Sequence, residues 1–189
     1  MEQFRQLKRF GRGRGCVFSE ADRPQPAGLH LPKRFRPAPG FELALNRALA
    51  ITPQHPAVLA QLGYALCYAG DWRRGLPLIE EAIPLTYEAP TWYYAAYAFV
   101  ALRQHHYAAA RDWALKIEGQ QWFMAPLLVA VSAASAGSSD IAAREVQRLL
   151  ELKPDFAATG RELLTRWNMD PDLLATLIAG LKLAGLELQ

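Results

Sequence analysis

Apolar residues recur every three to four positions from Phe41 onward, and short turns that contain polar residues or glycine separate these stretches. Leu62 and Leu66 illustrate the spacing, which places side chains on one face of an α-helix. One predicted helix ends before Pro154, because the residue that precedes a proline avoids the α region. The pattern therefore predicts an all-α protein whose folded part spans residues 41–189.

The helical stretches repeat with a period of about 35 residues. The turn AGDW at residues 69–72 returns as QHHY at residues 104–107, with Trp72 and Tyr107 at matching positions, and a third turn, AGSS, lies at residues 136–139. Each turn lies between two apolar stretches. A fixed period in this range is typical of helical-repeat proteins, in which each unit is a pair of helices.

Small residues occupy matching positions in the first helix of each predicted pair. These residues are Gly63, Ala98 and Ala130. Two helix axes approach to about 8 Å only where a small residue faces the neighbouring helix. A pair that packs in this way leaves one apolar face uncovered, so several pairs must stack to complete a core.

Five further motifs narrow the identification of the repeats. They are ALAI at residues 48–51 with Pro53, GDW at 70–72 with Gly75, PTWY at 90–93, RELL at 161–164 with Trp167, and GLKLAGL at 180–186. With these motifs, residues 41–189 resemble tetratricopeptide (TPR) repeats. The resemblance is to the C-terminal TPR region of bacterial multidomain regulators, which carry a class III adenylate cyclase domain or a winged-helix domain ahead of the repeats.

The resemblance implies a right-handed superhelical stack of about three antiparallel TPR helix pairs. A half repeat at residues 41–53 precedes them and capping helices follow. The last helix is predicted to begin with Asp170 as N-cap and Pro171 at its first position, and to stop near Gly185. Pro77 departs from the pattern, because a proline inside the second helix of a pair costs roughly 3 kcal/mol unless the helix kinks.

Charge divides the chain into two parts. Residues 1–40 contain nine Lys and Arg and three acidic residues, a net charge of +6, whereas residues 41–189 contain twelve and fifteen, a net charge of −3. Residues 1–40 are also rich in proline and glycine, which predicts a flexible basic leader. Nucleic-acid binding is expected only of this leader and is the weaker interpretation. With only this leader ahead of the repeats, we expect a stand-alone relative of the regulators or a fragment of one.

The resemblance also implies a binding groove, lined by the exposed faces of the first helices. Aromatic residues and arginine in such a groove are typical of protein-binding hot spots. We therefore expect a non-catalytic scaffold or regulatory module that binds a partner protein segment, for example in signalling. The predicted groove residues are Gln61, Tyr64, Tyr68, Trp92, Phe99, Arg103, Met124, Leu128 and Ser135.

Two other functions remain open at this stage. The chain is alternatively a structural arm of a larger regulator, with its groove filled by its own residues. It is alternatively a small-molecule sensor, in which the aromatic side chains of Tyr64, Tyr68, Trp92 and Phe99 form a pocket.

Catalytic and metal-binding motifs are not evident in the sequence. The serines lack a nucleophile elbow, and the adjacent carboxylates of Glu80 and Glu81 diverge by about 100° on a helix. His105 and His106 are neighbours on a turn, without Cys, Asp or Glu placed to complete a metal site, so we interpret them as solvated turn residues. We expect no enzyme activity, no metal and no cofactor.

Several features bear on the compartment. No apolar run reaches the roughly 18 residues of a membrane span, and the first residues lack the apolar stretch of a secretory signal. Cys16 and Cys67 show no metal-type spacing and are too few for a disulfide framework. We expect a cytoplasmic protein without a membrane partner.

Overall fold

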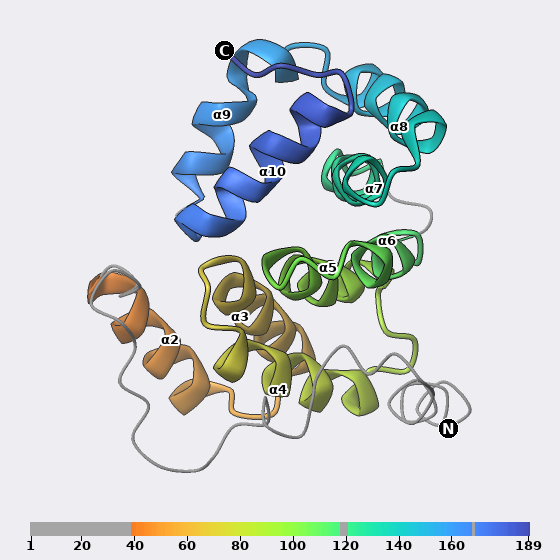
Figure 1. Cartoon of the computed structure of the whole chain (residues 1–189). Helices are drawn as coiled ribbons and strands as arrows, with labels where there is room; N and C mark the ends of the chain where they lie inside the picture. The colour runs from red at the N-terminus through yellow and green to blue at the C-terminus, as the bar shows by residue number, and fades with distance from the viewer. Residues whose placement is uncertain (1–38, 118–120, 168) are drawn as a thin grey trace.

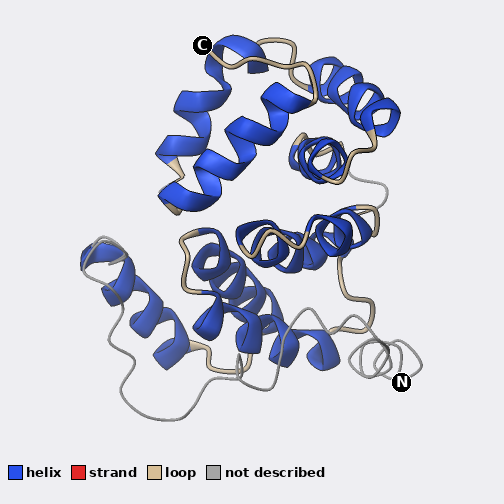
Figure 2. Cartoon of the chain, in the orientation of Figure 1, coloured by secondary structure: helices blue, strands red, loops and turns tan. Residues whose placement is uncertain are grey.

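The computed structural model describes residues 39–117, 121–167 and 169–189, and all regular elements within these ranges are helical (Figure 2). The prediction of an all-α protein is therefore confirmed for this part of the chain. In order, the elements are α2 (Pro39–Ile51), α3 (Pro56–Tyr68), α4 (Trp72–Ala82), the 3-10 turns η3 (Ile83–Leu85) and η4 (Thr91–Tyr93), α5 (Tyr94–Arg103), α6 (Tyr107–Ala114), α7 (Met124–Ser135), α8 (Ser139–Leu152), α9 (Phe156–Arg166) and α10 (Pro171–Leu183).

The predicted boundary between leader and folded part is close to the first described helix. Helix α2 begins at Pro39, two residues before Phe41. The rest of the predicted leader, residues 1–38, lies outside the described residues.

Helices α3 to α8 pack as three consecutive pairs, α3–α4, α5–α6 and α7–α8 (Figure 1). A turn of three residues joins the two helices in each pair. Between pairs, α5 contacts α3 and α4, and α7 contacts α5 and α6. The pairs therefore follow one another in space in the order in which they occur in the sequence.

The same backbone motif ends the first helix of each pair. Gly70, His105 and Gly137 adopt positive φ angles of 92°, 59° and 80°. The N–H of the following residue donates a hydrogen bond to the carbonyl five residues earlier, at 2.8 Å in all three turns. This is the Schellman motif, which satisfies carbonyls at the end of a helix and favours glycine at the left-handed position. His105 adopts this conformation despite its side chain, so the turn persists where the sequence departs from the pattern.

The small residues lie where the paired helices cross. A Cβ atom added to Gly63 would lie 2.6 Å from the carbonyl oxygen of Gly75, and a Cβ atom on Gly75 would lie 2.6 Å from the carbonyl oxygen of Gly63. Matching positions in the other two pairs hold fully buried alanines: Ala98 and Ala110, Ala130 and Ala142. The close approach of α3 and α4 therefore depends on glycine in both helices.

Helix α4 continues through Pro77 and ends at Ala82. Asp71 caps its start, where the carboxylate accepts a hydrogen bond from the backbone N–H of Arg74 and pairs with the Arg74 guanidinium. Pro77 cannot donate to the carbonyl of Arg73, but both residues are exposed. The proline therefore lies on the solvent-facing side of α4, away from the close crossing with α3.

The C-terminal helices return to the first helices of the pairs instead of extending the array. Helix α10 packs against α7 and α5, and α9 lies beside it (Figure 1). The start of α10 agrees with the prediction, because Asp170 caps it, Pro171 opens it and Gly185 follows its end with a φ of 90°. The backbone N–H of Gln189 then donates to the carbonyl of Ala157 in α9, at 3.0 Å.

Candidate binding face beneath helix α10

Helix α10 packs on α7 and α5, and its N-cap residue reaches the end of α3. Three local observations define this contact: the N–H of Asp170 donates to the carbonyl of Tyr68, Arg103 pairs with Asp170, and Gly180 lies against Val131. Phe99 and Leu128 belong to the same buried cluster as the leucines of α10. We call Tyr68, Phe99, Arg103, Leu128 and Val131 the α10 docking face.

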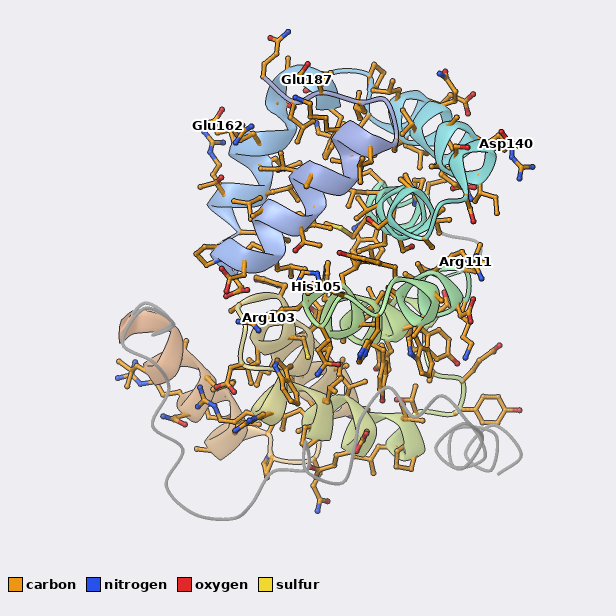
Figure 3. The ribbon with its side chains drawn as sticks, viewed as in Figure 1. Arg103, His105, Arg111, Asp140, Glu162 and Glu187 are labelled. Atoms are coloured by element: carbon orange, nitrogen blue, oxygen red, sulfur yellow. The ribbon has the colours of Figure 1, made fainter. Side chains whose placement is uncertain are left out.

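A buried carboxylate fixes the start of α10 on this face. The side chain of Asp170 is 0% exposed, and its Oδ2 atom accepts hydrogen bonds from the N–H of Leu173 at 3.0 Å and from Nε of Arg103 at 2.9 Å. Arg103 is 25% exposed, and its second contact is with Asp172 at 3.6 Å. Figure 3 shows Arg103 beside α3 and α5, below the start of α10. One carboxylate thus caps α10 and neutralises a cation on α5.

Gly70, in the turn between α3 and α4, lies directly beside this carboxylate. A Cβ atom on Gly70 would lie 3.0 Å from Oδ1 of Asp170 and 3.2 Å from its Cβ atom. That Oδ1 atom is buried and has no hydrogen-bond partner. The pairing of α10 with its face is therefore close but incompletely hydrogen-bonded.

Apolar contacts continue along α10. Its buried residues Leu173, Leu177 and Leu181 follow a four-residue spacing, so they lie on one face of the helix. Gly180 also faces the array, because a Cβ atom there would lie 2.5 Å from Cγ1 of Val131. Leucines and a glycine thus let α10 approach α7 closely along the face.

The nine predicted groove residues differ widely in exposure. Phe99, Met124 and Leu128 are 0% exposed, so they do not face solvent as expected of an open groove. Gln61 is exposed. The other five are half-buried: Tyr64, Tyr68, Trp92, Arg103 and Ser135. In this conformation much of the predicted lining is packed inside the molecule.

The four aromatic residues of the predicted pocket do lie together. The ring centroid of Tyr64 is 5.3 Å from that of Tyr68, 5.7 Å from that of Trp92 and 5.6 Å from that of Phe99. Trp122 joins them at 6.0 Å from Tyr64. The rings therefore pack against one another, in the tilted and edge-on arrangements that aromatic side chains favour.

Tyr64 is polar but has no polar contact. Its hydroxyl oxygen is buried without a hydrogen-bond partner. Burial raises the pKa of this hydroxyl, and the neighbouring Tyr68 raises it further. The hydroxyl therefore stays neutral at physiological pH.

The sequence analysis named Trp167 and Asp170 but did not place either of them in this region. Trp167, after α9, contacts Tyr68 at 6.4 Å and Phe123 at 5.8 Å between ring centroids, so it bridges α3 and the residue before α7. Asp170 was predicted only as an N-cap. Its ion pair with Arg103 joins residues 67 positions apart, and no local pattern encodes it.

The adjacent histidines remain outside this face. Both are exposed, and a ring nitrogen of His105 lies 2.9 Å from the hydroxyl of Tyr107, so His105 has a protein partner as well as solvent. Within residues 39–117, 121–167 and 169–189, no three His, Cys, Asp or Glu side chains come together as metal ligands. None of the helices in these ranges has both the length and the apolar character needed to cross a bilayer.

No protein-family model, curated protein or solved structure matches this chain significantly. The TPR resemblance therefore remains a prediction.

Proposed function

We propose that the chain is a non-catalytic TPR-type interaction module that binds a partner protein segment on the α10 docking face, in exchange for its own helix α10. The observation that carries this proposal is that the face already holds a helix. It does so with the ion pairs of Arg103 to Asp170 and Asp172 at the helix start and a row of leucines along the helix, and a row of apolar anchors is the usual means by which grooves hold amphipathic helices.

Three features support a TPR-type superhelix of antiparallel pairs. The helices pack in consecutive pairs, and the first helix of each pair ends in the same Schellman turn. Two glycines face each other in the first pair, and buried alanines occupy the matching positions of the other two. In the proposed superhelix the α10 docking face is the TPR groove. A bacterial, cytoplasmic regulator is the setting that the sequence resemblance favours.

A second candidate is a structural arm whose groove stays filled. The complete burial of Phe99, Met124 and Leu128 favours it. The two candidates differ in whether α10 leaves its face while the rest of the array stays folded. That difference is measurable, because hydrogen exchange reports local opening separately from global unfolding.

Native-state hydrogen exchange on the full chain is the test. If a partner segment can displace α10, the backbone amide hydrogens of α10 should exchange with solvent at least about tenfold faster than those of α5 and α7. The protection of α5 and α7 should reflect global unfolding. Asp170→Asn should speed the exchange of α10 further, while Asp140→Asn, in the exposed first turn of α8, should not. Equal protection of α10, α5 and α7 in all three proteins would favour the filled arm.

A further inference from the structure

We propose that a proline-rich motif of this chain, RPQP at residues 23–26, binds to a partly exposed aromatic face around helix α3. This inference goes beyond the proposed function, because it does not require α10 to leave its place. The aromatic face consists of five half-buried residues: Tyr64, Tyr68, Trp92, Trp122 and Trp167.

The rings of the aromatic face form one connected surface. The ring centroid of Tyr64 lies 5.7 Å from that of Trp92 and 6.0 Å from that of Trp122. The centroid of Tyr68 lies 5.3 Å from that of Tyr64 and 6.4 Å from that of Trp167. Each of the five side chains keeps part of its surface in contact with solvent. A contiguous exposed apolar patch of this kind is typical of a binding site.

The three tryptophans add hydrogen-bond donors to this face. No described residue accepts a hydrogen bond from the indole N–H of Trp92, Trp122 or Trp167, and none of these nitrogens is among the polar atoms that are buried without a partner. An indole N–H can only donate. A ligand that suits the face therefore combines apolar surface with exposed hydrogen-bond acceptors.

Proline-rich segments have this combination. In the polyproline II conformation the backbone makes no internal hydrogen bonds, so its carbonyl oxygens are free to accept. Proline rings pack on aromatic side chains, and the fixed φ of proline lowers the entropy that is lost on binding. Grooves lined with aromatic residues recognise proline-rich segments in this way.

The chain contains the motif Arg-Pro-x-Pro twice, as RPQP at residues 23–26 and as RPAP at residues 36–39. The second copy ends at Pro39, which is already the first residue of α2, so it is not free to bind in an extended form. The first copy lies wholly ahead of the helices. Its Arg23 can also stack on a tryptophan ring, since a guanidinium is attracted to the face of an indole. We therefore assign the aromatic face to residues 23–26.

The connection to α2 is long enough for this contact. Twelve residues, 27–38, separate the motif from α2, and they can span up to about 40 Å. Helix α2 has 13 residues, a length of about 20 Å, and packs against α3, which carries Tyr64 and Tyr68 (Figure 1). A short tether gives an effective concentration in the millimolar range, so even a weakly binding motif is held.

The experiment records the indole N–H signals of the tryptophans in the full-length chain by heteronuclear NMR. The test variant replaces both prolines of the motif, Pro24→Ala with Pro26→Ala. The matched control is Pro32→Ala, which makes the same change outside the motif. Single Trp→Phe variants assign the signals, and circular dichroism verifies that the helices are unchanged.

We expect the signals of Trp92 and Trp122 to shift in the test variant and to stay in place in the control. The signal of Trp113, whose ring stacks on two tyrosines of α5, should not shift in either variant. A peptide with the sequence of residues 20–29, added to the test variant, should return the two signals towards their wild-type positions at millimolar concentration. The same peptide with alanine at both prolines should not.

Each other result overturns the assignment. Unshifted Trp92 and Trp122 signals in the test variant would show that residues 23–26 do not occupy the face, and binding of the peptide to the wild-type chain would then mean that the face takes its ligand from another molecule. An equal shift in the Pro32→Ala chain, or no recovery with the peptide, would show that the motif is not the ligand. Signals of the wild-type chain that shift on dilution would identify the occupant as the motif of a second copy. None of these results depends on whether α10 opens, so the proposed function stands or fails by its own test.

Discussion

The crossing of α3 and α4 leaves no room for a methyl group on Gly63, and Gly63→Ala is therefore the sharpest test of the packing. The added Cβ atom would lie 2.6 Å from the carbonyl oxygen of Gly75 and 2.9 Å from Cγ1 of Ile79. The isoleucine side chain can rotate to some extent. The carbonyl is part of the helix backbone, so the two helices must move apart.

The expected magnitude combines two opposing effects. Overpacking a tight core costs about 1–3 kcal/mol, with the upper part of the range expected when the displaced group is backbone. Replacing glycine by alanine inside a helix returns up to about 1 kcal/mol. We expect Gly63→Ala to lower the free energy of unfolding by about 2 kcal/mol, which for a chain of this size lowers Tm by about 4–8 °C.

Urea denaturation followed by circular dichroism measures this change, and Gly40→Ala provides the control. Gly40 is also helical, but nothing lies within 4 Å of its added Cβ atom, so alanine there should leave stability unchanged or raise it slightly. A Gly63→Ala chain as stable as the wild type would refute the close crossing of α3 and α4. The paired-helix argument built on that crossing would fail with it.

Three further changes test other features. Pro77→Ala should raise the free energy of unfolding by about 1–2 kcal/mol in urea denaturation, because α4 continues past this residue and regains a hydrogen bond; a decrease would show that the proline is needed. His105→Gly should raise Tm by about 1–4 °C in thermal unfolding, since glycine adopts the positive φ of 59° without steric penalty; no gain would mean that the bond to the neighbouring tyrosine compensates. Burial raises the pKa values of Tyr64 and Tyr97, so above about pH 10 the unfolded chain loses protons that the native chain keeps, and stability should fall with rising pH. Phenylalanine at both positions should flatten this fall in Tm between pH 9 and 11, and an unchanged slope would contradict the assignment.

Local signals in the sequence were sufficient for the helices and several of their ends. The Asp170-Pro171 start of α10 and Gly185 after its end are chemical requirements of single turns, so they are readable without knowledge of the fold. The in-register small residues also predicted which helices cross closely. The turn at His105 shows that such a signal can weaken in sequence while the backbone conformation persists.

The position of α10 was not readable in the same way. The repeat pattern describes contacts between neighbouring pairs and implies an open face on the first helices. Covering that face depends on Arg103 meeting Asp170 and on Gly180 meeting Val131, contacts between residues about 50 or more positions apart. The same apolar residues that predict a groove also predict a core, and only the fold decides between them.

The location of α10 affects how the protein emerges during synthesis. Helices α3, α5 and α7 are complete once Ser135 has been made. Leu181 of α10 is not made until 46 residues later. At the usual rates of translation this interval lasts about 2–9 seconds. During that time Val131 of α7 lacks its contact with Gly180, so the face that α10 later occupies is exposed in a newly made molecule.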